Sequence, residues 1–259
     1  MQDLKIALIQ MNQAWENHAA NLALAATHID GMREKADLIV LPDMFTTGFT
    51  LNAAACSQAM NGSAVQWMQE TSRRVNTDIT GSMIISDRGG FYNRLVWAKP
   101  DGSLHLYDKR HLFRMADEHK VFTGGSSNIT VELNGWSVRP FICYDLRFPA
   151  WTRNRGSEYH LALFVGSWPA KRLDHWSALL RARAIENQCF VIGVNRTGTD
   201  GNGVEYAGGS AAFDFTGNTI FDAGRPEGAS IIQLQSRPLL EYRETFPAWM
   251  DADDFSIDA

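Results

Sequence analysis

The first part of the chain alternates between short apolar runs and longer amphipathic stretches. Residues 4–10 and 37–43 are mostly apolar and predict strands, and a further strand is expected over 78–85. Between them, apolar residues recur at the helical period of about 3.6 residues in 17–36 and 63–76, which predicts two amphipathic helices. The run at 37–43 is apolar throughout its middle, so we expect its sheet to be buried on both faces.

The middle of the chain changes to a hairpin pattern. Residues 92–99 and 104–107 flank Pro100-Asp101-Gly102-Ser103, a turn sequence. Two further strands, at 129–133 and 136–143, flank Asn134-Gly135, a dipeptide typical of tight hairpin turns.

The alternation of helix and strand returns in the last part of the chain. The expected elements are strands at 161–165, 190–194 and 230–235, a helix at 173–188, and a strand pair at 211–215 and 219–222. The tail at 237–259 is too aromatic for a disordered segment, so we expect it to pack on the core or on a partner subunit. The pattern predicts a single domain spanning 1–259, of the α/β class, with two sheets face to face and outer helices.

Composition and charge exclude several classes of protein. The chain has 259 residues, of which 45% are hydrophobic and 20% are charged, and a net charge of −5. There is no basic block, so nucleic acid and acidic membrane surfaces are not expected partners. No apolar stretch approaches the ~20 residues of a membrane span, and the N-terminus lacks a signal-peptide pattern. The three cysteines are widely spaced, which favours reduced thiols in the cytoplasm.

Cys143 is the leading candidate for a nucleophile. It ends the apolar run at 136–143, and a polar turn at 144–147 follows it directly. A thiol at a strand end is held rigidly and can face a cleft, and the N–H groups of a turn can stabilise an oxyanion. The alternative is that Cys143 is a core residue, as most strand cysteines are. Cys189 begins the apolar run at 189–193 and Cys56 has no charged residue nearby in the sequence, so we assign both to packing.

Two further strand ends carry charged side chains that a reactive thiol needs. Asp43 ends the second strand and is a candidate base, although an aspartate after proline also commonly forms a turn. Lys109 follows the strand at 104–107 and is a candidate for stabilising an oxyanion, with a solvated charge cluster as the alternative. Glu118 lies in an acidic loop, and a carboxylate in such a loop is usually exposed to solvent.

Other catalytic patterns are missing from the sequence. There is no glycine-rich dinucleotide motif, no phosphate-binding loop and no HExxH motif. The seven histidines do not have the spacing of metal ligands, so we expect no metal site.

Several motifs that occur in order resemble the nitrilase superfamily of carbon–nitrogen hydrolases, and most closely its omega-amidase branch. The matching segments are Leu41-Pro42-Asp43-Met44-Phe45, residues 107–113, Cys143-Tyr144-Asp145-Leu146-Arg147-Phe148-Pro149, and residues 167–169, 182–188, 195–198 and 246–249. The resemblance implies an αββα sandwich that dimerises into a longer αββα–αββα stack. It also implies a Glu–Lys–Cys triad with no metal and no organic cofactor. By motif, Lys109 and Cys143 carry over directly, and Glu118 matches a second family glutamate that positions the lysine and substrate.

The chain departs from the family pattern at Asp43, where the family has glutamate. Aspartate keeps the charge but is one methylene shorter, which withdraws the carboxylate by on the order of 1.5 Å. A misplacement of about 1 Å can cost about 100-fold in rate. Either the backbone lies closer and restores the reach, or the enzyme is a weakened variant.

The resemblance implies hydrolysis of the terminal amide of 2-oxo-dicarboxylic acid monoamides, such as 2-oxoglutaramate and 2-oxosuccinamate, through a thioester on Cys143. In this scheme Asp43 is the base and then the acid, while Lys109 and the backbone N–H of Tyr144 stabilise the oxyanion. One rival is another linear amide, nitrile or carbamoyl substrate on the same scaffold. Another rival is a catalytically idle dimer that binds a small acid or a protein partner.

Three side chains are candidates for binding the substrate. Arg147 is a candidate for gripping the distal carboxylate, and its alternative is an ion pair with Asp145 or another acid. Trp168 and Phe45 are candidates for an apolar wall, and their alternative is the core.

Overall fold

The fold is built from two six-stranded sheets, seen in a computed structural model that describes residues 1–257. In each sheet, three neighbouring parallel strands are extended by antiparallel strands. The strands of the first sheet, in spatial order, are β14 (Gly228–Leu234), β1 (Leu4–Gln10), β2 (Leu38–Val40), β3 (Asp78–Asp87), β4 (Gly90–Ala98) and β5 (Leu104–Asp108). Those of the second are β13 (Thr219–Asp222), β12 (Ala211–Phe213), β9 (Phe190–Asn195), β8 (Leu161–Gly166), β7 (Trp136–Ile142) and β6 (Val131–Leu133).

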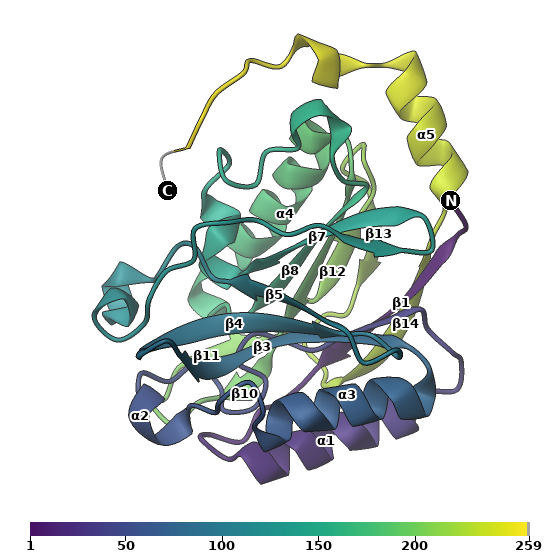
Figure 1. Ribbon diagram of the computed structural model, residues 1–259. Coiled ribbons are helices and arrows are strands. Elements are labelled where there is room, and N and C mark those ends of the chain that lie inside the picture. The colour runs from purple at the N-terminus through teal and green to yellow at the C-terminus, as the bar shows by residue number, and fades with distance from the viewer. Residues whose placement is uncertain (258–259) are drawn as a thin grey trace.

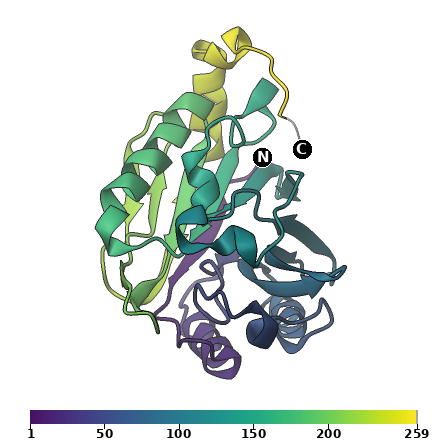
Figure 2. The same ribbon diagram turned by 90° about the vertical axis from the view of Figure 1, so that its left-hand side faces the viewer.

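Helices cover the outer faces of both sheets (Figures 1 and 2). The first sheet is covered by α1 and α3, and the second by α4. The helices of the described chain are α1 (His18–Asp30), α2 (Ala53–Cys56), α3 (Ser63–Val75), α4 (Leu173–Asn187) and α5 (Ser236–Thr245). The expected αββα sandwich is confirmed.

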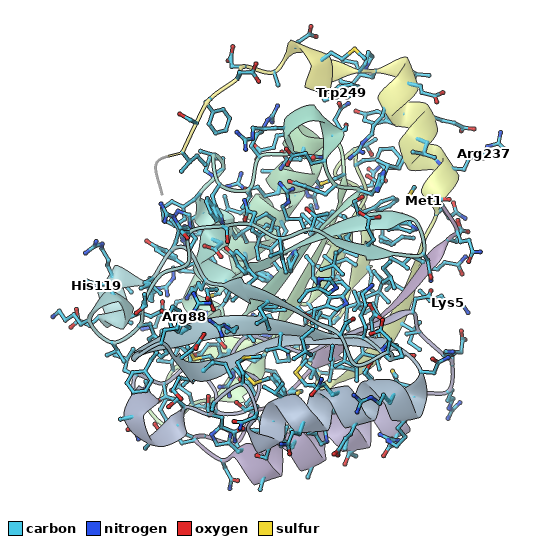
Figure 3. The ribbon with its side chains drawn as sticks, in the orientation of Figure 1. Met1, Lys5, Arg88, His119, Arg237 and Trp249 are labelled. Atoms are coloured by element: carbon cyan, nitrogen blue, oxygen red, sulfur yellow. The ribbon has the colours of Figure 1, made fainter. Side chains whose placement is uncertain are left out.

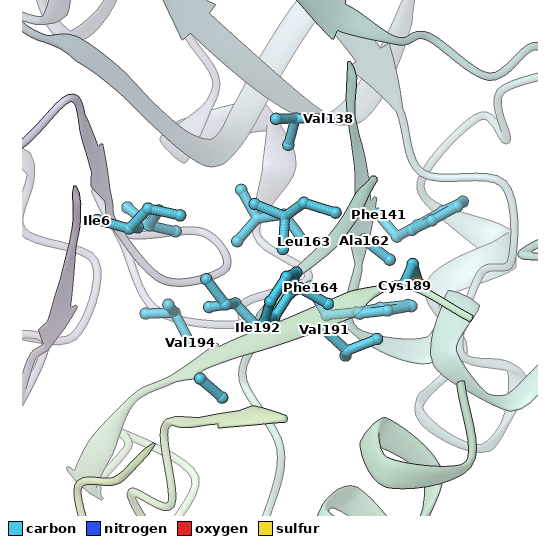
Figure 4. Close-up of a cluster of buried hydrophobic side chains, with 14 of the residues drawn as sticks. Ile6, Val138, Phe141, Ala162, Leu163, Phe164, Cys189, Val191, Ile192 and Val194 are labelled. Carbon is cyan, nitrogen blue, oxygen red and sulfur yellow. The ribbon is translucent and has the colours of Figure 1, made fainter. Parts of the chain in front are cut away.

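The strands are apolar on both faces because each sheet packs on two neighbours. In β1, Ile6 and Leu8 point into the cluster between the two sheets, whereas Ala7 and Ile9 join the cluster beneath α1 and α3. Figure 4 shows part of the cluster between the sheets, which continues through the second sheet to the face covered by α4, where Phe141, Phe164 and Cys189 lie. Cys189 is fully buried and Cys56 is 4% exposed, in agreement with packing roles for both.

Several predicted boundaries were wrong. The helix expected over 17–36 ends at Asp30, and the strand expected over 37–43 is confined to Leu38–Val40. Pro42 has no N–H to donate to a ladder, which accounts for the early end of this strand. A short two-stranded ribbon, β10 (Thr197–Thr199) and β11 (Glu205–Ala207), was not predicted, because its residues do not alternate between apolar and polar.

The C-terminal segment begins with α5, which packs on its own chain. Leu239 is fully buried, and the Arg243 guanidinium donates to the carbonyl oxygens of Gln188 and Tyr159. Beyond α5 the chain crosses the top of the molecule past Trp249 (Figure 3). Positions 258–259 of the predicted tail lie outside the described residues.

Candidate active site

The candidate catalytic residues follow strands of both sheets. Cys143 comes directly after β7, and Ser167 comes directly after the neighbouring parallel strand β8. Lys109 comes directly after β5, and Asp43 lies three positions beyond β2. Because the sheets face each other, residues from distant parts of the sequence can meet at one place.

Cys143 lies on the wall of a cavity of about 630 Å³. It is the first residue of a 3₁₀ helix, Cys143–Arg147, and has a left-handed backbone conformation with φ of 44°. Such a φ is unusual for a residue with a side chain and is typical of functional turns. The Cys143 thiol therefore lies at the end of a strand and faces a cavity, which is the position that the sequence predicted.

The Cys143 thiol is protonated near neutral pH. Burial raises its pKa to about 12, and the negative charge of Asp43 acts in the same direction. The Lys109 ammonium and a hydrogen bond from the backbone of Ser167 oppose this shift. A nucleophilic attack by this sulfur therefore needs a base that removes the proton.

Lys109 is held by Glu118 in a buried ion pair. Its ammonium nitrogen lies 2.9 Å and 2.8 Å from the two carboxylate oxygens, and the two side chains are 1% and 0% exposed. Burial alone would lower the pKa of Lys109, but the charges of Glu118, Cys143 and Asp43 outweigh burial and raise it. Lys109 therefore carries a full charge at neutral pH. The default expectation that Glu118 is exposed was wrong.

Asp43 is fully buried behind the cavity wall. Its Oδ1 accepts hydrogen bonds from the Ser82 hydroxyl at 2.7 Å and from the Asn93 amide at 2.9 Å, whereas its Oδ2 has no partner. The Ser167 hydroxyl donates to the Asp43 carbonyl oxygen at 3.1 Å, which connects this loop to the turn after β8. Within residues 1–257, neither Asp43 nor Glu118 belongs to the lining of the cavity.

Asp145 fastens the turn that carries Cys143. Its Oδ2 accepts from the Tyr107 hydroxyl at 2.7 Å and from the backbone N–H of Ile142 at 3.1 Å. Its Oδ1 lies 2.9 Å from the backbone nitrogen of His111 and 2.8 Å from the imidazole Nδ1 of that residue. Since Tyr107 and His111 flank Lys109 in the sequence, this buried carboxylate joins the cysteine turn to the lysine segment.

Tyr144 follows Cys143 directly on the turn and also lines the cavity. Its ring packs edge-on against Phe113 and Phe148, with centroids 5.0 Å and 5.1 Å away. These ring contacts hold the turn that carries the backbone N–H of Tyr144.

Arg147 and Trp168 both line the cavity. The Arg147 guanidinium lies 4.8 Å from the centre of the Trp168 ring, and one of its nitrogens is 3.1 Å from Nδ1 of His175. Among the described residues no acid pairs with Arg147, and Asp145 is occupied by the donors named above. The guanidinium is thus positioned to bind an anionic group in the cavity.

Phe45 does not form part of an apolar wall, because its side chain lies in the core, which was the alternative for this residue. It is fully buried, its ring is 6.2 Å from that of Trp67, and it does not line the cavity. Phe49, four positions later, lines the cavity instead and lies 5.7 Å from the Lys109 ammonium. The sequence showed two nearby phenylalanines but not which one the loop turns inward.

Two further segments line the cavity, and the sequence assigned no substrate-binding role to either of them. One is the projecting loop that contains His119 in Figure 3, which contributes Phe113 and Met115 to the cavity. The other is the connection around β11, which contributes Asp200 and Tyr206. The Tyr206 hydroxyl donates to Asp200 at 2.9 Å, so a hydrogen bond holds these two lining residues together.

Residues 1–257 contain no cluster of three or more His, Cys, Asp and Glu side chains that could hold a metal ion. In the same part of the chain, no helix is both long and apolar enough to cross a membrane.

Comparison with known proteins gives a consistent result. The carbon–nitrogen hydrolase family model matches residues 5–244. The omega-amidase YafV of Escherichia coli (strain K12) is 46% identical over 99% of this chain and 100% of its own length. The 2-oxoglutaramate amidase of Bacillus subtilis (strain 168) is 35% identical over 95% of this chain and 96% of its own. A CN-hydrolase superfamily protein from Xanthomonas campestris, solved with an arsenic adduct in its active site, is 41% identical and superposes with a TM-score of 0.97 over 100% of both chains.

Proposed function

This chain belongs to the carbon–nitrogen hydrolase family, and from that premise we propose that it is an omega-amidase whose nucleophile is Cys143. The substrates are small 2-oxo-dicarboxylic acid monoamides, such as 2-oxoglutaramate and 2-oxosuccinamate. The similarity to omega-amidases over nearly the full length supports the activity. The observation that carries the proposal is that Cys143 and the charged Lys109 share one cavity wall, with the Asp43 carboxylate buried behind it.

The first half of the reaction forms a thioester. Asp43 takes the thiol proton while the sulfur of Cys143 bonds to the amide carbon, and the carbonyl oxygen becomes an oxyanion. The Lys109 ammonium and the backbone N–H of Tyr144 stabilise this oxyanion. Asp43 then gives its proton to the leaving nitrogen, the carbon–nitrogen bond breaks and ammonia departs.

The second half releases the acid. A water molecule attacks the thioester carbon and gives its proton to Asp43, and the carbon–sulfur bond then breaks. The proton on Asp43 returns to the sulfur of Cys143, which restores the starting state. One carboxylate serves as base and acid in both halves.

The short side chain of Asp43 limits the rate in this scheme. Its Oδ1 is tied to Ser82 and Asn93, and the carboxylate is not part of the cavity wall. A glutamate would reach further by on the order of 1.5 Å. This position supports the account in which the chain is a weakened variant, which hydrolyses its amide substrates slowly.

Arg147 binds the distal carboxylate of the substrate. Its guanidinium faces the cavity and is steadied by Trp168 and His175, while no acid among the described residues neutralises it. A guanidinium and a carboxylate can form two parallel hydrogen bonds, which selects substrates that carry an acid at the far end.

We also infer that the protein is a single-domain homodimer of the cytoplasm. The exposed apolar side chains of Phe246 and Met250, which are 56% and 65% exposed, favour a contact between subunits near the C-terminal segment. The three free cysteines favour a reducing compartment.

The test is ammonia release from a panel of linear compounds. The panel contains 2-oxoglutaramate, 2-oxosuccinamate, the same chain without the distal carboxylate, a nitrile and a carbamoyl compound. We expect the two 2-oxo acid amides to have the highest kcat/KM. A preference for the nitrile or carbamoyl compound would replace the substrate assignment, and no turnover of any compound would favour a binding role.

A further inference from the structure

Two buried polar residues outside the cavity converge on Asp43. Ser82 lies in β3 and Asn93 in β4, and both side chains are fully buried. They donate to the same oxygen, Oδ1, at 2.7 Å and 2.9 Å. Neither residue lines the cavity, so neither is in a position to touch the substrate.

Their hydrogen bonds leave one oxygen of the carboxylate available. Oδ1 already accepts two hydrogen bonds, while Oδ2 is buried and has no protein partner. Burying a carboxylate oxygen without a hydrogen-bond donor destabilises the folded protein, so such an oxygen is typical of a position that has a role in a reaction. Both oxygens of an ionised carboxylate accept, and because Oδ1 is already engaged, Oδ2 is the oxygen left to take a proton.

Asn93 also fixes the segment that carries the lysine. Its backbone carbonyl oxygen accepts a hydrogen bond from the backbone N–H of Lys109 at 2.9 Å. One residue of β4 therefore contacts the acid through its side chain and the lysine through its main chain. Ser82 plays a matching part for the acid, since its hydroxyl oxygen accepts from the backbone N–H of Met44, the next residue after Asp43.

We propose that Asn93 and Ser82 are positioning residues, which orient Asp43 so that Oδ2 is the oxygen that exchanges protons with Cys143. This inference rests on the proposed function, because it gives these residues a part in the same reaction. With the shorter acid at position 43, the two hydrogen bonds decide where its reactive oxygen lies.

The experiment compares Asn93→Leu and Ser82→Ala with the wild type and with a matched control, Ser72→Ala. Ser72 is also fully buried and its hydroxyl donates to carbonyl oxygens, but it lies in α3 away from the cavity. We expect kcat to fall by about 10- to 100-fold in Asn93→Leu and Ser82→Ala, with KM changed by less than about 3-fold. Ser72→Ala should retain kcat.

The proposal is overturned if Ser82→Ala keeps the wild-type kcat, or if Ser72→Ala loses as much activity as Ser82→Ala. Ser82→Ala decides the matter if Asn93→Leu does not fold, since removing one hydroxyl is the smaller change. A wild type that releases no ammonia would instead overturn the proposed function, so the two failures can be told apart.

Discussion

The carboxylate of Glu118 holds the ammonium of Lys109 with both of its oxygens, at 2.9 Å and 2.8 Å, in a place where both side chains are buried. The pair fixes a charged lysine at the cavity wall. Replacing Glu118 with glutamine would keep its size but remove the charge that raises the pKa of Lys109. Breaking a buried ion pair by removing one partner typically costs about 3–5 kcal/mol, so this variant should lose stability as well as activity.

That loss can be measured as a free energy of unfolding in urea, together with kcat for 2-oxoglutaramate. The control is Glu241→Gln, which removes a carboxylate from a pair with Arg237 that is largely exposed. Equal stability of Glu118→Gln and the wild type would contradict the structural role of the pair.

Asp43→Glu should raise kcat. The longer side chain extends the carboxylate toward the cavity and recovers part of the reach that aspartate lacks, a change that can be as large as about 100-fold. Steady-state ammonia release from the two enzymes measures the effect. A lower kcat in Asp43→Glu would mean that the surroundings of Ser82 and Asn93 are built for the shorter acid.

Asp43→Asn should lower the pKa of Cys143 while it also lowers turnover. Burial is the larger cause of the raised pKa of Cys143, and this substitution leaves burial unchanged. The substitution does remove the negative charge of Asp43, which also raises that pKa. A lower pKa gives more thiolate at a given alkaline pH, so iodoacetamide should alkylate Cys143 faster than in the wild type. Peptide mapping separates this reaction from that of Cys56 and Cys189. Slower alkylation together with unchanged turnover would contradict the account.

Arg147→Gln should raise KM for 2-oxoglutaramate. Hydrogen bonds to charged groups contribute about 1.5–3 kcal/mol, which corresponds to about 10- to 100-fold in affinity. KM for the amide without a distal carboxylate should change little, because this substrate has no group that binds the guanidinium. Arg237→Gln, at an arginine side chain that is 87% exposed, is the control. An equal rise in KM for both substrates would show that Arg147 has a structural role.

The sequence predicted the sandwich and most of its strands because their apolar runs are long and are separated by clear turn residues. It singled out Asp43, Lys109 and Cys143 because each follows such a run. The assignment of Glu118 came from the family resemblance alone, since an acidic loop gives no local sign that one carboxylate turns inward.

The supporting residues were not predictable in the same way. Ser82 and Asn93 lie inside strands, where a polar residue usually indicates a position that faces solvent. The choice between Phe45 and Phe49 depends on how the loop after β2 turns, which no local pattern records. Tyr206 belongs to a ribbon too short and too polar to be recognised from periodicity.

Mass spectrometry of the enzyme, quenched in acid during turnover of 2-oxoglutaramate, tests whether Cys143 forms the thioester. We expect an acyl adduct on the peptide that contains Cys143, removed by hydroxylamine and missing from a folded Cys143→Ala variant that releases no ammonia. Ammonia release by Cys143→Ala at the wild-type rate, or an adduct on another residue during turnover, would contradict this role of Cys143.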